Sequence, residues 1–435
     1  MLIKAIHTFS SFLFPDFLYS ETDFLKGPLL INPYKWGLLS LVVIGTFTVP
    51  KYQQLISMKY LKKGFTMMLL LIAINGFSQT ADSIKSCAWQ LNATYKGDFV
   101  TNFNGGITTG STYLGLADLF LRFDAEKAGL WKGGEFLVHG ANSHGGEPSA
   151  NLIGDFQVVS NIEAGNHTFL YELWFKQRFA NITATVGLQD LNAEFASSNV
   201  ASMFINSSFG VHSVISDNVL APIFPLTSPG ITLCWNKSEN ISLKTAVYKG
   251  CPIDFEHNPY NTKWSLNHLQ GLLWVTEGQY SWTGIQEKGN VLKAGVFFHQ
   301  HCPESDVVNS ETGNELTHDY GFYLVGDHQL DSKFSVFYQL GLSPRNDNYG
   351  YLGAGCAYTG LFSKKGNDIL GLAIADGMLT KERGKNETTF ELSYKVQLTP
   401  QIYLQPDLQY VVHPGGTDVQ LKNATVGLVR LGLEF

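Results

Sequence analysis

Three hydrogen-bonding residues stand at alternate positions near the middle of the chain: Asp190, Asn192 and Glu194. Alternate side chains of a strand project from one face, so this spacing predicts a row of acceptor oxygens. Carboxylate and amide oxygens accept hydrogens from the hydroxyl groups of a solute. Groups spread along a wall bind such a solute weakly at several points and release it readily, unlike a single tight pocket.

Donors for a hydroxylated solute are predicted on two other strands. The segment 169–179 separates apolar from polar side chains, and 119–124 contributes Arg122. The polar face of 169–179 carries Glu172, Trp174, Lys176 and Arg178. Lysine and arginine can donate to ring oxygens, and an indole offers a flat stacking surface. Two alternatives stay open: the charges only pair with one another, or Trp174 belongs to an interfacial aromatic girdle.

These residues do not fit an enzyme or a metal site. Asp190 and Glu194 suggest an acid and a base, but four positions along a strand span roughly 13 Å, too far for a retaining glycosidase pair. The chain has no GxSxG motif, and a barrel lipase would need a Ser/His pair on its outer wall. His299, His301 and Cys302 are close in sequence, yet they begin a polar loop and lack a second ligand set. We expect no catalysis, no metal and no cofactor.

The elements that position these side chains are predicted to be β-strands. The C-terminal segment 425–435 alternates without interruption. One face carries Thr425, Gly427, Val429, Leu431, Leu433 and Phe435, and the other carries Val426, Leu428, Arg430, Gly432 and Glu434. Segments 390–398 and 401–410 are two-faced in the same way, with a bulge or kink expected at Pro406. In 169–179 the predicted apolar face consists of Phe169, Tyr171, Leu173, Phe175 and Phe179. The predicted fold is an all-β, transmembrane antiparallel barrel with lipid outside and water inside.

Composition and connection lengths agree with a barrel. Charged residues make up 15% of the chain, aromatic residues 13%, and there are 43 glycines, which suits aromatic girdles and tight turns. In the second half, short connections alternate with long polar ones, as in barrels with short periplasmic turns and long outer loops. About seventeen strands can be drawn, but two termini on one side of the membrane require an even number. Residues 79–435, at about 22 residues for each strand and connection, predict sixteen strands.

Charge and cysteine content exclude other classes. The net charge of −7 leaves no basic field for nucleic acid. The five cysteines are odd in number and have no CxxC spacing. We therefore expect neither a zinc site nor a disulfide framework.

A secretory signal peptide is predicted at residues 58–78. Three lysines precede the apolar run 65–74, and Gly76 and Ser78 stand at the −3 and −1 positions of a cleavage site. This signal begins after residue 57, so we expect 1–57 to be a non-native extension from an overlong gene assignment. The alternative, a membrane anchor at 37–49, falls short of the roughly 20 residues that a spanning helix needs. Residues 79–435 are then the barrel domain.

Several blocks, in order along 185–435, resemble the carbohydrate-selective porin family of the OprB type. They are GLQDLNAEFASSNVASMFINSSFG at 187–210, PIFPL at 222–226, FYQLGLSPRNDN at 337–348, ELSYKVQLTPQIYLQPDLQYVVHPGG at 391–416 and the terminal strand. The resemblance implies a sixteen-stranded porin of the Gram-negative outer membrane that passes glucose and other small sugars passively. Within the matched blocks, Asn206, Asp407 and Gln409 join the predicted pore-lining residues.

The segment 191–230, rich in serine, asparagine and small residues, is predicted to fold into the barrel and narrow it. The predicted partners are small sugars, the lipid bilayer and the outer-membrane assembly machinery, which would recognise the strand ending in Phe435. An oligomer is compatible with the sequence. Two other functions stay open: a general diffusion pore, and a plugged structural or adhesive barrel whose loops bind.

Overall fold

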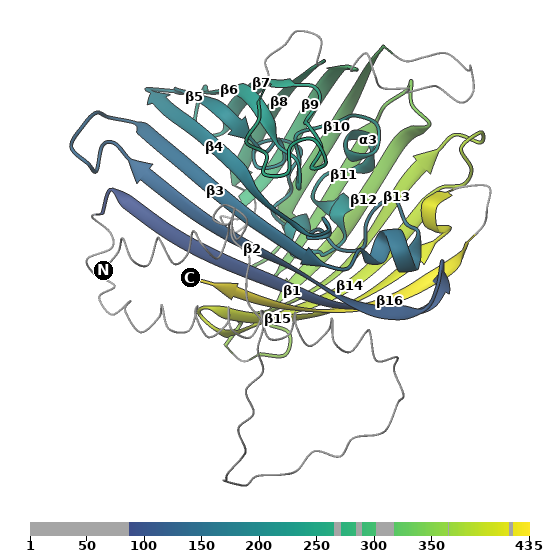
Figure 1. Ribbon diagram of the computed structural model, residues 1–435. Helices are drawn as coiled ribbons and strands as arrows, with labels where there is room; N and C mark the ends of the chain where they lie inside the picture. The colour runs from purple at the N-terminus through teal and green to yellow at the C-terminus, as the bar shows by residue number, and fades with distance from the viewer. Residues whose placement is uncertain (1–86, 265–270, 284–288, 302–316, 364, 417–420) are drawn as a thin grey trace, which may run out of the picture. The chain divides into compact units, whose positions relative to one another are not determined.

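The computed structural model describes residues 87–264, 271–283, 289–301, 317–363, 365–416 and 421–435. These residues form a closed antiparallel barrel of sixteen strands with almost no helix (Figure 1). The strands are β1 (Trp89–Gly106), β2 (Gly110–Asp124), β3 (Gly134–Gly145), β4 (His167–Phe179), β5 (Ile182–Gln189), β6 (Ser228–Asn236), β7 (Ile241–Lys249), β8 (Leu272–Thr283), β9 (Gly289–Gln300), β10 (His318–Gln329), β11 (Phe334–Leu342), β12 (Asn348–Thr359), β13 (Asp368–Leu379), β14 (Glu387–Thr399), β15 (Ile402–Val412) and β16 (Lys422–Glu434). Short helical turns are η3 (Ser149–Ile153), η4 (Ala201–Met203), η5 (Ser207–Phe209), α3 (Ser213–Ser216) and η7 (Pro414–Gly416).

Each strand pairs with its neighbours in sequence, and the ring closes where β1 pairs with β16. Asp98 of β1 stands opposite Arg430 of β16 at this seam. The even strand number brings the start of β1 and the end of β16 to the same end of the barrel. The predicted all-β fold and its sixteen strands are confirmed.

Alternation assigns the two faces of the wall as predicted. In β16, Val429 and Leu431 are exposed, whereas Leu428 and Arg430 are buried. In β14, Phe390 and Leu392 are exposed while Glu391 and Ser393 are fully buried. The outward residues provide the apolar surface that lipid requires, and the inward ones face the lumen or whatever fills it.

One predicted face is wrong. The sequence places Phe169 and Tyr171 with Leu173, but the first two are 3% and 6% exposed and belong to a buried cluster, while Leu173 is 37% exposed. In the pairing of β3 with β4, His139 stands opposite Glu172 and Gly140 opposite Leu170, so Tyr171 is an extra residue. Such a bulge exchanges the inner and outer faces of a strand, and sequence alternation does not reveal it.

The expected bulge at Pro406 is absent. The register of β14 on β15 is the same on both sides of this residue. Two residue pairs are missing from the ladder, those that lie between the pairs Ser393–Asp407 and Val396–Leu404. Pro406 occupies an outward position and remains paired with Val429 of β16. The missing N–H therefore interrupts the ladder locally without shifting the strand.

Connection lengths differ between the two ends of the barrel. At the end shared by the termini, turns are as short as 180–181 and 400–401. At the opposite end lie the long connections 146–166, 190–227 and 250–271, although 107–109 and 343–347 at that end are short. The prediction of short turns on one side and long loops on the other is confirmed for the longest connections, but 125–133 and 360–367 at the end shared by the termini are longer than 380–386 at the opposite end.

Glycines of the wall make room for aromatic rings on neighbouring strands. A Cβ built on Gly295 would lie 2.0 Å from the ring of Tyr323, and one on Gly321 would lie 2.3 Å from the ring of Phe297. These rings lie over the glycines, which have no side chain to obstruct them. Part of the high glycine and aromatic content therefore reflects wall packing as well as turns and girdles.

The predictions for 1–57 and for the signal peptide 58–78 lie outside the described residues. Among the described residues, no helix is long and apolar enough to cross a bilayer. Cys87, Cys234 and Cys356 are free thiols, but Cys251 is disulfide-bonded. One disulfide-bonded cysteine is not the disulfide framework that the spacing argues against, and spacing along the chain does not report proximity in space.

Candidate functional site

The connection between β5 and β6, residues 190–227, lies inside the barrel, with α3 and neighbouring coils within the ring of strands (Figure 1). Its apolar side chains form a buried cluster with inward residues of the wall, such as Tyr323, Phe337 and Tyr351. The prediction that 191–230 folds inward is confirmed, apart from its last three residues, which begin β6.

Polar side chains of the wall bind the backbone of this segment at successive points. Glu277 of β8 accepts from the N–H of Ala196 at 2.8 Å. Further along, Asp327 of β10 accepts from the N–H of Asn199 at 2.8 Å. Side-chain donors complete the set by reaching carbonyl oxygens: Lys293 to Ser197, Gln339 to Phe209, Tyr351 to Ser208 and Gln405 to Met203. The in-folded backbone thus replaces lost water contacts with wall side chains.

A second connection, residues 146–166 between β3 and β4, is also folded inward. Both carboxylate oxygens of Glu387 accept from its backbone, at 3.1 Å from Phe156 N and 3.0 Å from Gln157 N. The two in-folded segments join through reciprocal backbone bonds, Asn161 N to Ile205 O and Ser207 N to Val158 O, each 2.9 Å. They therefore form one unit.

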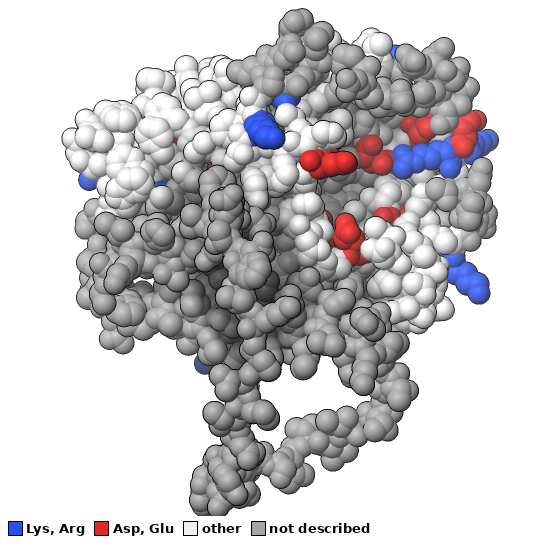
Figure 2. All heavy atoms as spheres, viewed as in Figure 1, with Lys and Arg blue, Asp and Glu red and all other residues white. Residues whose placement is uncertain are grey.

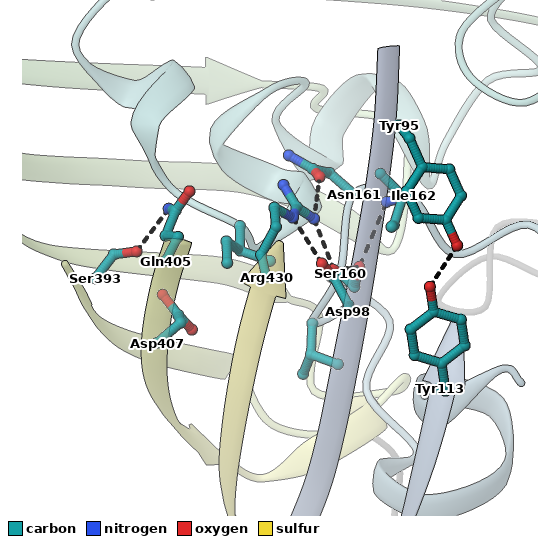
Figure 3. Close-up of polar contacts among 12 residues, drawn as sticks. Tyr95, Asp98, Tyr113, Ser160, Asn161, Ile162, Ser393, Gln405, Asp407 and Arg430 are labelled. Atoms are coloured by element: carbon teal, nitrogen blue, oxygen red, sulfur yellow. Dashed lines mark hydrogen bonds and ion pairs between the residues drawn. The ribbon is translucent and has the colours of Figure 1, made fainter. Parts of the chain in front are cut away.

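The seam between β1 and β16 holds this unit through a buried ion pair (Figure 3). Asp98 accepts from Nε and Nη2 of Arg430 at 2.7 Å each, and from the hydroxyl of Ser160 at 2.7 Å. The guanidinium also donates to Asn161 Oδ1 at 2.9 Å. Such a bidentate pair fixes the geometry of both partners.

A different arrangement lines the inner faces of β2 to β4. His139 lies between two carboxylates, with Nε2 3.0 Å from Asp118 and Nδ1 3.2 Å from Glu172. Glu172 also accepts from the indole N–H of Trp174 at 3.1 Å. Trp174 is 8% exposed and Lys176 lies 4.6 Å over its ring, so it faces inward and one face of its indole is covered.

Asp190 borders this cluster from the first residue after β5. Burial, with a smaller contribution from the charge of Glu172, raises the pKa of Asp190 to about 7. Its Oδ1 accepts from the backbone N–H of Asn192 at 2.8 Å. This carboxyl therefore changes its charge near neutral pH.

An ion trio links the start of segment 190–227 to the wall. Glu194 lies 3.7 Å from Lys176 Nζ and 3.1 Å from Lys244 Nζ, and all three side chains retain exposure, at 32%, 22% and 19%. Toward the other end of the wall, Arg122 pairs with Glu135 at 3.1 Å, with exposures of 43% and 25%. Arg178 is exposed near the end of β4. We call this set of charged residues the open strip of the lumen: Arg122, Glu135, Glu172, Lys176, Arg178, Glu194 and Lys244.

The surface shown in Figure 2 carries acidic and basic residues near one another, not a field of one sign. The open strip has the same balance, because Glu135 pairs with Arg122, and Glu194 pairs with Lys176 and Lys244. A balanced wall offers donors and acceptors to neutral polar solutes without strongly attracting ions of either sign.

The predicted strand face of Asp190, Asn192 and Glu194 is wrong. Strand β5 ends at Gln189, and 191–195 form a turn in which Leu191 O accepts from the N–H groups of Glu194 and Phe195. Glu194 faces the wall lysines, whereas the amide of Asn192 donates to Gly210 O at 2.9 Å and holds the segment's own fold. The argument from a 13 Å spacing therefore does not apply.

Three other predicted pore-lining residues lie in the contact between the in-folded unit and the wall. Asn206 and Gln409 have no exposed surface, and Asp407 is 7% exposed. Asn206 donates to Gln409 Oε1 at 3.2 Å, and Gln409 donates to Asp407 Oδ1 at 3.1 Å. The structure therefore brings these residues together, but away from the open strip.

Several residues of the lumen were missed by sequence reasoning: Asp118, His139, Lys244 and Glu277. Lys244 occupies an inward position of an alternating strand, so the signal for its orientation was available. The partners of these residues lie far away in the sequence, and alternation does not identify them.

Among the described residues, no group of three or more His, Cys, Asp or Glu side chains can hold a metal ion. His301 lies 2.5 Å from Asp319, and His299 lies 2.7 Å from the carbonyl oxygen of Gly250. Cys302 lies outside the described residues.

Comparisons with known proteins place this geometry in context. Residues 108–435 match the model of the carbohydrate-selective porin family, OprB. Porin B of Pseudomonas aeruginosa is 23% identical over 402 residues, covering 78% of this chain and 86% of that protein. The high pH structure of Pseudomonas putida OprB superposes with a TM-score of 0.72 at 17% identity, covering 83% of this chain and 97% of that one. The low pH structure of the same protein gives 0.53 at 15% identity, covering 81% and 94%.

Proposed function

Because this chain belongs to the OprB family of carbohydrate-selective porins, we propose that it admits monosaccharides such as glucose by passive diffusion. Membership makes it a sugar porin of the Gram-negative outer membrane. We further propose that it acts only as a channel, with no catalysed reaction and no cofactor.

The open strip is the observation that carries the choice of solute. Apart from Arg178, its charged side chains are paired, Glu172 with His139 and the others with one another, yet they keep 13 to 43% of their surface exposed. Each carboxylate can accept from a sugar hydroxyl, and each ammonium or guanidinium can donate to a sugar oxygen. Because these groups already have partners, the gain from a passing sugar is small, which suits rapid release.

The in-folded unit favours a selective pore over a general one. Two segments occupy the lumen, and their contacts extend from β8 through β15. A narrowed lumen forces a solute to shed part of its hydration, so only solutes that recover those hydrogen bonds from the wall pass quickly. In this account Trp174 supports the open strip by binding Glu172 and does not stack on the sugar.

Permeation into liposomes carrying the purified protein tests the proposal. We expect glucose to enter faster than amino acids of similar size, and ion conductance in a planar bilayer to be low and to fall when sugar is added. Equal rates for all small solutes would instead identify a general diffusion pore. No permeation through a folded barrel would identify a plugged barrel and refute the transport function.

We also propose that the outer-membrane assembly machinery recognises the C-terminal strand. Phe435 extends the pairing of β16 beyond its last residue, with backbone bonds to Ala93 of 2.9 and 3.0 Å. A Phe435→Ala variant should reach the membrane in reduced amounts but refold in detergent as well as the unchanged protein. Equal amounts in the membrane would refute this role. An oligomer is compatible with this proposal.

A further inference from the structure

Two fully buried side chains lie where both in-folded segments meet the wall. Glu391 of β14 and Gln409 of β15 are directly opposite each other in the strand register. Both point inward and both are 0% exposed. Neither belongs to the open strip, so neither contacts a passing solute.

Glu391 binds segment 190–227. Its two carboxylate oxygens accept from consecutive backbone N–H groups, at 2.6 Å from Ile205 N and 3.0 Å from Asn206 N. Hydrogen bonds to a buried carboxylate are stronger than those between neutral groups. Both N–H groups lose their partner together when this carboxylate is removed, and an unpaired buried donor is costly.

Gln409 binds both segments at once. Its Oε1 accepts from Asn206 Nδ2 at 3.2 Å, and its Nε2 donates to the carbonyl oxygen of Val159 at 2.9 Å. Val159 belongs to segment 146–166, which is bonded to segment 190–227 by backbone bonds at Val158 and Asn161. This pair of wall residues therefore contacts the in-folded unit at its junction.

We propose that Glu391 and Gln409 are positioning residues that set the width of the pore. The inference rests on the proposed sugar-porin function, because pore width matters only if solute passes. Segment 190–227 is covalently attached to the wall only at β5 and β6, on the other side of the ring from β14 and β15. Its depth within the lumen therefore depends on noncovalent contacts with the far wall. Loss of the junction lets the unit move away from that wall and leaves the barrel strands in place.

Substitutions at the junction test this role. The variants are Glu391→Ala, Gln409→Ala and the milder Glu391→Gln, which keeps one acceptor oxygen. The matched control is Gln397→Ala, because Gln397 lies on the inner face of the same strand but its amide binds only carbonyl oxygens of the adjoining turn, at Thr399 and Pro400. The measurement is liposome entry of a disaccharide and a trisaccharide relative to glucose, with single-channel conductance.

We expect the disaccharide-to-glucose ratio and the conductance to rise several-fold in both alanine variants, and by less in Glu391→Gln. The control should match the unchanged protein. The resistance of the barrel to unfolding in detergent identifies folded samples. If Glu391→Ala or Gln409→Ala does not fold, Glu391→Gln decides the question by itself.

An unchanged size cutoff in the folded variants would overturn the inference, even when the unchanged protein conducts glucose. The two proposals can also fail separately. If the unchanged protein does not pass glucose but the Glu391→Ala variant does, the result supports the positioning role and refutes the proposed function. A higher cutoff in Gln397→Ala as well would overturn the inference, because any inner-face change would then have the same effect.

Discussion

The two sides of the lumen use the same residue types in opposite ways. On the side of β8 to β15, Glu277, Asp327 and Glu391 are at most 6% exposed, and each accepts from backbone N–H groups of segment 190–227. On the side of β2 to β7, Glu172 and Glu194 pair with side chains and remain partly open to the lumen. The difference is whether an in-folded backbone covers the carboxylate.

Ion pairs show the same contrast. Arg430 and Asp98 are 5% and 0% exposed, and they also bind Ser160 and Asn161 of the in-folded unit. Arg122 and Glu135 are 43% and 25% exposed and bind each other at 3.1 Å. A buried pair is sensitive to the loss of one partner, whereas an exposed pair is screened by water and salt. The comparison therefore predicts how unequal the effects of similar mutations are.

The largest effect is expected for Arg430→Ala. This variant leaves the carboxylate of Asp98 buried at the seam without its cation, which should lower the free energy of unfolding by about 3–5 kcal/mol. Denaturant unfolding in detergent, followed by tryptophan fluorescence, measures the loss. The paired change Asp98→Leu with Arg430→Met should recover most of it, and no recovery would contradict the account.

A smaller effect, dependent on pH, is expected for Glu163→Gln in segment 146–166. Burial raises the pKa of Glu163 to about 7 from an ordinary value of 4.5. Between pH 4.5 and pH 7 the folded chain keeps a proton on Glu163 that the unfolded chain has released. The free energy of unfolding therefore falls as pH rises, by up to about 1.4 kcal/mol per pH unit for one whole proton. This contribution is fully present below pH 4.5 and is lost above pH 7.

Unfolding midpoints from pH 4.5 to 7.5 check this expectation. Glutamine cannot release a proton, so the variant should show a shallower decline than the unchanged protein. Burial also raises the pKa of Asp155, which is present in both proteins. Where the substitution leaves the titration of Asp155 unaltered, its contribution to the pH dependence of stability is the same in both proteins and cancels in their difference. Parallel curves for the two proteins would refute the assignment.

A still smaller effect on stability, but a measurable one on permeation, is expected for Lys244→Ala. Its side chain is 19% exposed and pairs with Glu194, so stability should change by about 0–1 kcal/mol. Loss of one cation from the open strip should shift ion selectivity toward cations, more at 0.1 M than at 1 M salt because the Debye length falls from about 10 to 3 Å. Reversal potentials measure the shift, with Lys237→Ala in the turn 237–240 as the control. Equal selectivity in both variants would place Lys244 outside the conducting path.

The smallest effect on stability is expected for Arg122→Ala. The pair with Glu135 is partly exposed, so its loss should cost about 0–1 kcal/mol, well below the loss for Arg430→Ala. The same unfolding assay compares the two arginines directly. A loss equal to that of Arg430→Ala would remove the distinction between the two sides of the lumen.

Sequence reasoning succeeded where the signal was local. Alternation identified the inward positions of Lys176 in β4, Glu391 in β14 and Arg430 in β16. It failed at Tyr171, where a bulge exchanged the faces, and at Asp190 to Glu194, where β5 ends and a turn begins. Three polar residues at alternate positions are consistent with a strand, but a turn that satisfies its own hydrogen bonds accommodates them equally well.

The sequence by itself determined the barrel, its two-faced wall and the inward segment, because each depends on a period of two or on the composition of one stretch. Only the tertiary structure decided which inward side chains stay open to the lumen and which hold the in-folded unit. Ile205 and Glu391 are 186 positions apart, and their contact depends on closure of the whole ring. No local pattern encodes that distance, so the same glutamate can line a pore or be buried against a backbone until the fold is complete.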